Sequence, residues 1–218
     1  ERIGLAAHAE DLMSVRQHED DPPCVLVGHS MGTQVCLENY HLFPKNVRGL
    51  ILICGSYGKV TSSFRGVPIL DFVLPKVMEL AEKRPELVRA FWSRIPPEIA
   101  LKLALRAGDI DHERIHPEDM LPYLQHMTHV DFPLFLKMLR SAGDHTAEGY
   151  MSKIDVPTLI IAGERDTFTP ASLSSYMAET IPNSELVTIE RGTHVAPIEQ
   201  PDVVEGIIKD FLHRRVLV

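Results

Sequence analysis

Four short apolar runs, separated by segments with helical signals, are the feature that most constrains the fold of this chain. The first three, residues 24–28, 49–54 and 158–162, are nearly continuous, which is typical of parallel strands covered on both faces. The fourth, residues 185–189, is interrupted by Thr188 and fits a strand nearer the sheet edge. Because helical segments alternate with these strands, the sequence predicts a doubly wound α/β fold with a mostly parallel sheet.

Helices are expected between and after the strands. Residues 11–18 and 31–43 carry helical signals on either side of the first strand. Thr169 and Pro170 predict the cap and first position of a helix after the third strand. Pro201 opens a final helix in which apolar pairs recur every four residues on one face.

The stretch from about residue 59 to residue 149 breaks this alternation. It has no convincing strand and carries five amphipathic helical segments, at residues 67–82, 84–95, 97–106, 117–128 and 132–142. Asp131 is expected to cap the last of them. A helical insert between two strands predicts a cap subdomain at 59–150, with the α/β core formed by 1–58 and 151–218.

Composition limits the partners of the chain. Its 218 residues, 44% of them apolar, suit one globular domain, and a formal net charge of -8 argues against nucleic acid and anionic membranes. The longest apolar runs of about five to eight residues are well short of the roughly 20 that span a bilayer. The three cysteines (Cys24, Cys36 and Cys54) give no disulfide framework and indicate free thiols, so a cytoplasmic location is expected.

The pentapeptide Gly-His-Ser-Met-Gly at residues 28–32 lies directly between the first strand and a helix. In that context, G-x-S-x-G predicts a tight turn that presents Ser30 as a nucleophile at the carboxyl edge of the sheet. Side chains at 28 and 32 are expected to clash, and Ser30 is expected to have a strained backbone. The amide of Met31, at the helix N-terminus, is the candidate oxyanion-hole donor. The alternative is that Ser30 only caps the helix.

Two further residues are expected at the same edge. Asp166 follows the third strand and His194 follows the fourth, and the order Ser, Asp, His is the one found with this turn. His194, neutral near pH 7, is the candidate base for Ser30, and Asp166 is the candidate residue that orients its ring. Glu164 is the nearest rival for the acid, and Asp166 and His194 could instead be ordinary loop residues.

With these motifs the chain resembles the α/β-hydrolase family, in the serine-nucleophile branch with a helical cap. The motifs are GHSMG, GERDTFTP at residues 163–170, and GTHVAP at 192–197 followed by EQP. The resemblance covers about residues 11–212 and implies an α/β-hydrolase fold with an inserted all-helical cap. It also implies activity similar to that of esterases, lactonases, C–C bond hydrolases or cofactor-free haloperoxidases, with no cofactor. Thr33 stands where many relatives have glycine.

The family places further strands before the one that leads to the serine, which need on the order of 70–90 residues. Only 23 residues precede Cys24. We therefore expect a missing N-terminal segment, or a second chain that completes the sheet. No second oxyanion-hole donor can be named from this sequence.

The helical insert carries apolar side chains that could bind a substrate. Met31, Trp92, Met127 and Phe135 are the candidate substrate-binding residues, and they predict a small-molecule apolar carbonyl substrate.

Other polar residues are interpreted without a chemical role. The carboxylates and histidines at residues 109–119 fit no standard metal spacing, so a solvated loop and no metal site are expected there. His29 is expected to pack or hydrogen-bond locally, and His126 and His129 are expected on a helix surface.

Three functions stay open at this level. The first is hydrolysis of a carboxylic ester, thioester, lactone or related carbonyl compound through an acyl-enzyme. The second is acyl transfer or cofactor-free perhydrolysis on the same three residues. The third is a non-catalytic ligand-binding protein of this fold.

Overall fold

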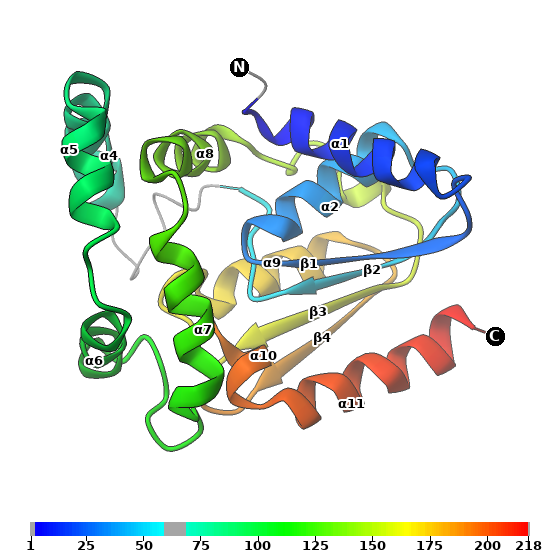
Figure 1. Ribbon diagram of the computed structural model, residues 1–218. Coiled ribbons are helices and arrows are strands. Elements are labelled where there is room, and N and C mark those ends of the chain that lie inside the picture. The colour runs from blue at the N-terminus through cyan, green and yellow to red at the C-terminus, as the bar shows by residue number, and fades with distance from the viewer. Residues whose placement is uncertain (1–2, 59–68, 218) are drawn as a thin grey trace.

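A computed structural model describes residues 3–58 and 69–217, and a four-stranded sheet lies at its centre (Figure 1). The strands, all parallel and in the order β1-β2-β3-β4, are β1 (Cys24–His29), β2 (Val47–Ile53), β3 (Thr158–Gly163) and β4 (Ser184–Ile189). Thr158 fixes the register at the centre, since it pairs with Leu50 of β2 and with Ser184 of β4. The predicted strands and the α/β fold class are confirmed.

Helices cover both faces of the sheet (Figure 1). One face packs against α1 (Leu5–His18), α2 (Met31–Leu42) and α9 (Ala171–Thr180), and the other against α11 (Pro201–Phe211). Successive residues of a strand point to opposite faces, so Leu50 and Leu52 join the first cluster whereas Ile51 and Ile53 join the second. All four are at most 5% exposed, which explains why this run is continuously apolar.

The two edges of the described sheet differ from the expectation in one respect. β4 is an edge strand, as predicted. β1 forms the other edge, and Val27 is 57% exposed although Leu26 on the opposite face is buried. The α11 cluster includes Val25 but not Val27, so the expected cover on both faces is wrong for this strand.

Arg16 joins α1 to α2 from a buried position. Its guanidinium donates to the Asn39 side chain at 2.9 Å and to the carbonyl oxygen of Phe43 at 3.0 Å. It also forms an ion pair with Asp21 at 2.9 Å. Because the guanidinium has these acceptors and a carboxylate partner, its buried charge is compensated.

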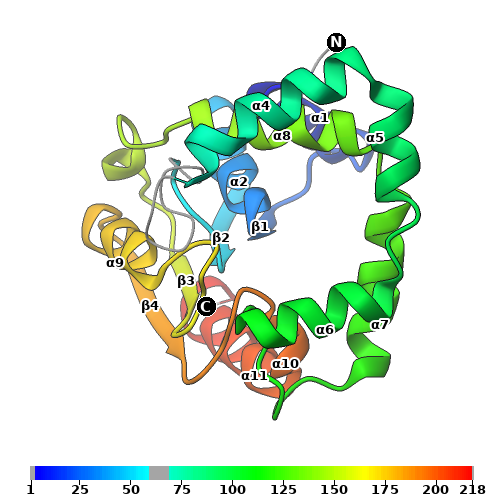
Figure 2. The same ribbon diagram turned by 90° about the vertical axis from the view of Figure 1, so that its left-hand side faces the viewer.

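Five helices lie beyond the carboxyl ends of the strands (Figures 1 and 2). They are α4 (Ile69–Lys83), α5 (Pro85–Trp92), α6 (Pro97–Ala107), α7 (Pro117–Thr128) and α8 (Phe132–Asp144), which confirms the five predicted segments. Asp131 caps α8 as expected, because its carboxylate accepts from the Leu134 amide at 3.2 Å. Residues 59–68, the start of the predicted insert, lie outside the described residues.

Two local details depart from the prediction. α9 begins at Ala171, with Pro170 rather than Thr169 as its N-cap, because the Thr169 hydroxyl is bonded to Asp166 instead. A short helix, α10 (Ala196–Glu199), was not predicted between β4 and α11. The predicted final helix starts at Pro201 as expected.

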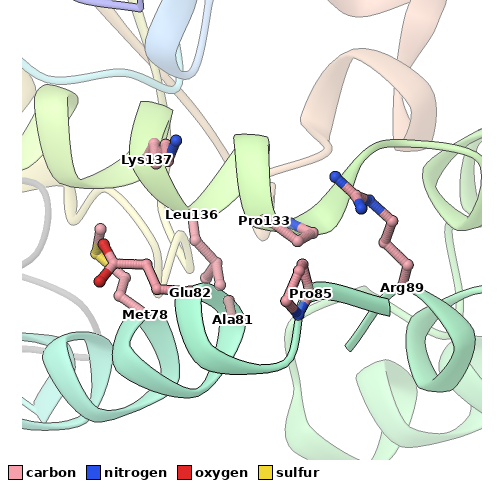
Figure 3. Close-up of a pocket in the computed structure, with 8 residues that line it drawn as sticks. All are labelled: Met78, Ala81, Glu82, Pro85, Arg89, Pro133, Leu136 and Lys137. Atoms are coloured by element: carbon pink, nitrogen blue, oxygen red, sulfur yellow. The ribbon is translucent and has the colours of Figure 1, made fainter. Parts of the chain in front are cut away.

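A pocket of about 280 Å³ opens between α4, α5 and α8 (Figure 3). Its lining combines an apolar floor with charged side chains: Met78, Ala81, Glu82, Pro85, Arg89, Pro133, Leu136 and Lys137. None of these residues follows a strand of the sheet. Within residues 3–58 and 69–217, no helix has both the length and the apolar character needed to cross a bilayer.

Candidate active site

The turn between β1 and α2 holds Ser30 in a backbone conformation that non-glycine residues rarely adopt, with φ 55° and ψ −123°. A Cβ atom at Gly28 would lie 2.3 Å from the carbonyl oxygen of Gly32, so the expected need for glycine is confirmed at position 28. It is wrong at position 32, where a Cβ atom would meet nothing within 4 Å. The predicted strain of Ser30 is confirmed.

Thr33, one turn into α2, fits because residue 55 is a glycine. Thr33 is fully buried, and its hydroxyl donates to the carbonyl oxygen of Gly28 at 3.3 Å. A Cβ atom at Gly55 would lie 2.0 Å from the Thr33 hydroxyl oxygen. The threonine therefore does not crowd the turn, since the chain after β2 leaves room for it.

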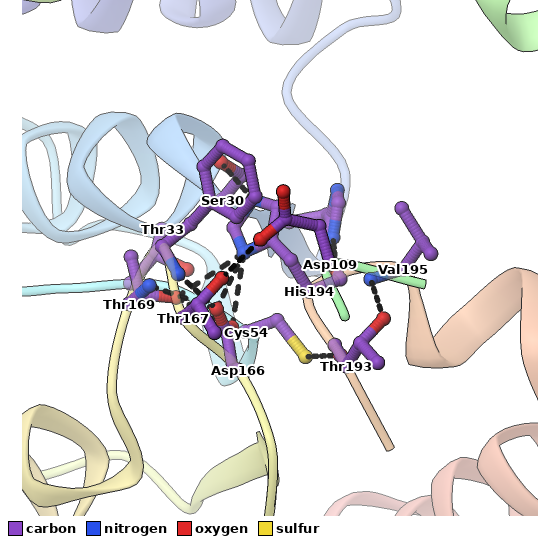
Figure 4. A network of polar contacts seen from close by, with 12 residues as sticks. Ser30, Thr33, Cys54, Asp109, Asp166, Thr167, Thr169, Thr193, His194 and Val195 are labelled. Carbon is purple, nitrogen blue, oxygen red and sulfur yellow. Dashed lines mark hydrogen bonds and ion pairs between the residues drawn. The ribbon is translucent and has the colours of Figure 1, made fainter. Parts of the chain in front are cut away.

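The structure brings the three strand-end residues together (Figure 4). The Nε2 atom of His194 lies 2.8 Å from Oγ of Ser30, and its Nδ1 atom lies 2.9 Å from Oδ2 of Asp166. An ionised carboxylate only accepts, so Nδ1 carries the ring proton and Nε2 is free to accept from the Ser30 hydroxyl. This is the tautomer in which the imidazole acts as a base toward the serine.

Asp166 is buried and its oxygens are surrounded by donors. Oδ1 accepts from the amides of Phe168 and Thr169, both at 2.8 Å, and Oδ2 accepts from the Thr169 hydroxyl at 2.8 Å. These bonds stabilise the charged carboxylate in a site from which water is excluded. They also orient the group, so that Oδ2 lies 2.9 Å and Oδ1 lies 3.2 Å from Nδ1 of His194.

Two rings flank the His194 imidazole. The Phe168 ring lies 5.0 Å from it and the His29 ring 5.2 Å, measured between centroids. His29 also donates from Nε2 to the carbonyl oxygen of His194 at 2.8 Å, across 165 residues of sequence. Although His29 is exposed, the protein around its ring partly removes water from it, and this desolvation lowers its pKa. His29 thus packs and hydrogen-bonds as expected, but its partner is a residue that is distant in the sequence.

Met31 is the first residue of α2. Amides in the first turn of a helix have no partner within the helix, and they lie at its positive end. The Met31 amide therefore stays the candidate oxyanion-hole donor beside Ser30.

Cys54, directly after β2, lies close to the loop that carries His194 but is not one of the three residues Ser30, His194 and Asp166. Its thiol donates to the carbonyl oxygen of Thr193 at 3.6 Å, and burial raises its pKa to about 12. It is thus a neutral thiol near pH 7. All three cysteines are free in the structure, and only Cys24 is not fully buried.

The rival acid lies elsewhere. The exposed Glu164 accepts from the Arg191 amide at 2.7 Å, and His194 has Asp166 as its carboxylate partner. His126 and His129 are exposed on α7 and its end, as expected.

The interpretation of residues 109–119 as a solvated loop is wrong for Asp111. This residue is 7% exposed and its carboxylate pairs with Arg191 at 3.0 Å. Burial alone would raise the pKa of Asp111, but the Glu113 amide and the Arg191 guanidinium hold it below its ordinary value. Over the described parts of the chain, no group of three or more His, Cys, Asp or Glu residues is arranged to hold a metal ion.

Three of the predicted substrate-binding residues form one cluster in the helical region. Trp92 donates from its indole nitrogen to the carbonyl oxygen of Met127 at 2.7 Å and stacks on Phe132 with centroids 4.0 Å apart. Phe135 lies 6.1 Å from Phe132, also between centroids. These contacts join α5, α7 and α8, and a role in substrate binding stays a prediction.

Sequence reasoning missed the residues that support the histidine loop, namely Thr169, Glu199, Asp111 and Arg191. Glu199 and Thr169 stand inside motifs that were already recognised, EQP and GERDTFTP. Their place inside these motifs was the signal that could have identified them, because the backbone polar groups of a buried loop need hydrogen-bond partners.

Comparison with known proteins gives consistent matches. A family model described as alpha/beta hydrolase fold matches residues 1–201. The putative carbamate hydrolase RutD of Pseudomonas savastanoi pv. phaseolicola is 32% identical over 192 residues, which are 87% of this chain and 68% of that protein. The uncharacterized hydrolase YugF of Bacillus subtilis is 25% identical, over 94% of this chain and 70% of its own length. An esterase structure from Exiguobacterium antarcticum superposes with a TM-score of 0.74 at 19% identity, over 97% of this chain and 75% of that one.

Proposed function

The chain belongs to the alpha/beta hydrolase fold family, and from this premise we propose that it is a serine hydrolase that works through an acyl-enzyme on Ser30, His194 and Asp166. The substrates we propose are carboxylic esters, lactones and related carbonyl compounds. A single observation carries the proposal. One imidazole lies within hydrogen-bond distance of a strained serine hydroxyl on one side and of a buried carboxylate on the other.

In the first half-reaction, Ser30 Oγ attacks the substrate carbonyl carbon while Nε2 of His194 takes the hydroxyl proton. The carbonyl oxygen becomes an oxyanion, which the Met31 amide stabilises at the N-terminus of α2. Collapse of this intermediate breaks the bond to the leaving group. His194 returns its proton to that group, and Ser30 is left acylated.

In the second half-reaction, water replaces the serine as nucleophile. His194 takes a proton from the water as the oxygen attacks the acyl carbon, and then returns that proton to Ser30 Oγ. The products are a carboxylic acid and the regenerated hydroxyl. Asp166 holds the imidazole in the required tautomer and stabilises the imidazolium in both steps.

We propose that residues 59–150 act as a helical cap over this site, and that Met31, Trp92, Met127 and Phe135 bind an apolar substrate. The aromatic contacts between α5 and α8 support an apolar lining. Because a relative at 32% identity is named a putative carbamate hydrolase, carbamates are a second substrate class to test. The three free thiols support a reducing compartment such as the cytoplasm.

The test is a panel of p-nitrophenyl esters, lactones and carbamates with the wild-type protein and with Ser30→Ala. We expect turnover by the wild type and loss of the serine-dependent rate in the variant. A fluorophosphonate is expected to label Ser30 covalently, which mass spectrometry of the tryptic peptide detects. A properly folded wild type that neither turns over the panel nor reacts with the fluorophosphonate would refute the proposal.

The same panel separates hydrolysis from the other functions left open by the sequence. Adding an alcohol or hydrogen peroxide as a competing nucleophile and analysing the products reports acyl transfer or perhydrolysis. Tight binding of a small molecule that is never turned over, with Ser30→Ala binding equally well, would favour a non-catalytic role.

A further inference from the structure

Glu199, at the end of α10, is a buried carboxylate that contacts the residue next to the histidine base. It is 5% exposed. Its Oε2 atom accepts from the Thr193 amide at 2.9 Å, and its Oε1 atom accepts from the Thr193 hydroxyl at 2.8 Å. Hydrogen bonds to a charged acceptor in a buried site are among the stronger ones in proteins, so the position of Thr193 is well determined.

The main chain of the histidine is therefore held on both sides. On its amino side Glu199 holds Thr193, and on its carboxyl side His29 donates to the carbonyl oxygen of His194. The main chain at Thr193 has little room to shift, since a Cβ atom at Gly163 would lie 2.5 Å from the carbonyl oxygen of Thr193. Asp166 orients the ring, whereas these main-chain bonds determine where the ring is.

The third donor to Glu199 comes from the loop between α6 and α7. The Asp111 amide donates to Oε1 of Glu199 at 2.8 Å, across 88 residues of sequence. The Asp111 carboxylate is in turn paired with Arg191, three residues before the histidine. Ile110 and Ile115 of this loop pack with Val195 in one buried cluster. Polar and apolar contacts thus fasten the helical region to the two sides of His194.

We propose that Glu199 is a positioning residue for His194, which acts through Thr193 and couples the loop between α6 and α7 to the base. This inference rests on the proposed serine hydrolase function. A displacement of a catalytic base by about 1 Å can cost on the order of 100-fold in rate. Loss of the Glu199 carboxylate is therefore expected to lower the rate of serine attack while the substrate still binds.

The variant that tests this is Glu199→Gln, which keeps the side-chain volume. Its amide nitrogen must replace one carboxylate oxygen, and it then faces the Thr193 amide or the Asp111 amide, which are also donors. We expect kcat to fall by about 10- to 100-fold with little change in KM, and fluorophosphonate labelling of Ser30 to slow by a similar factor.

Matched variants separate positioning from a general loss of stability. Glu205→Gln on α11 removes an exposed carboxylate that pairs with Lys209, and its kinetics are expected to match the wild type. Thr193→Val removes the hydroxyl donor and is expected to slow labelling, whereas Thr193→Ser keeps it and is expected to restore the rate. In the double variant Glu199→Gln/Thr193→Val the two losses are expected to be non-additive, because they remove the same contact.

The outcomes decide between the two levels of the proposal. If the fluorophosphonate does not label the wild type at Ser30, the serine hydrolase function fails and the positioning role fails with it. If the wild type is labelled and a folded Glu199→Gln is labelled equally fast, only the positioning role is overturned. If Glu199→Gln does not fold, the two Thr193 variants decide. Equal labelling rates for Thr193→Val and Thr193→Ser overturn the positioning role, and slower labelling of Thr193→Val supports it.

Discussion

Replacing Asp166 by asparagine is expected to abolish most activity without disturbing the shape of the site. The carboxylate has two different sides: Oδ1 accepts from two main-chain amides, and Oδ2 faces the Thr169 hydroxyl and Nδ1 of His194. The asparagine oxygen must take the Oδ1 position, because only an acceptor satisfies the amides of Phe168 and Thr169. Its NH₂ group then faces the imidazole and donates to Nδ1.

The His194 imidazole of this variant is then in the wrong tautomer to act as a base toward Ser30. With Nδ1 accepting, the ring proton moves to Nε2, which can no longer accept from the Ser30 hydroxyl. A loss of about 10⁴ in kcat is expected for a triad in this state. By transition-state arithmetic that is about 5.4 kcal/mol.

The assay is the single-turnover acylation rate with p-nitrophenyl acetate, since acylation is the step in which Ser30 loses its proton. Circular dichroism and thermal unfolding verify that the variant is folded. Glu164→Gln is the control, because this exposed carboxylate contacts the Arg191 amide, and its rate is expected to stay within about twofold of the wild type. An Asp166→Asn rate within tenfold of the wild type would show that the tautomer argument is wrong.

Three further predictions concern the scaffold. Gly28→Ala is expected to lower the free energy of urea unfolding by about 1–3 kcal/mol because its Cβ would overlap a carbonyl oxygen, whereas Gly32→Ala, which meets nothing, is expected to leave it unchanged or raised. Arg16→Ala is expected to lower it by about 1–3 kcal/mol, since the buried Asn39 side-chain oxygen loses its donor and the half-buried Asp21 carboxylate loses its ion-pair partner; an unchanged stability would contradict this. Burial raises the pKa of Cys36 and Cys54 to about 12. In native protein at pH 8 only the half-buried Cys24 is therefore expected to react with Ellman's reagent, whereas all three cysteines react in denaturant.

The strands and the strand-end residues were predictable because each depends on a local pattern. A parallel strand covered on both faces is continuously apolar, as in residues 49–53 of β2, and its neighbours need not be known. Ser30 directly follows β1, and Asp166 and His194 lie in the loops that follow β3 and β4. Since parallel strands end at the same edge of a sheet, the topology alone brings the three loops to one place.

The supporting contacts were not predictable, because each joins segments that are distant in sequence. His29 contacts His194 across 165 residues, and Glu199 contacts Asp111 across 88. Asp111 stands in a run rich in charged residues, which is usually a solvated surface. It is buried here because Arg191, with a φ of 58°, turns its guanidinium toward it after β4. No local pattern specifies that turn.

Two buried carboxylates, Asp166 and Glu199, lie beside the same histidine and are satisfied in different ways. Each needs several donors, because an uncompensated buried charge is costly. Asp166 accepts main-chain amides at one oxygen and the Thr169 hydroxyl at the other, and it faces Nδ1 of His194, so it controls which nitrogen holds the proton. Glu199 uses both oxygens on Thr193 and Asp111, so it controls the path of the chain. Loss of Asp166 should therefore change protonation, and loss of Glu199 should change geometry. Because both defects impair the same proton transfer from Ser30, combining them should cost much less than the product of the two separate losses.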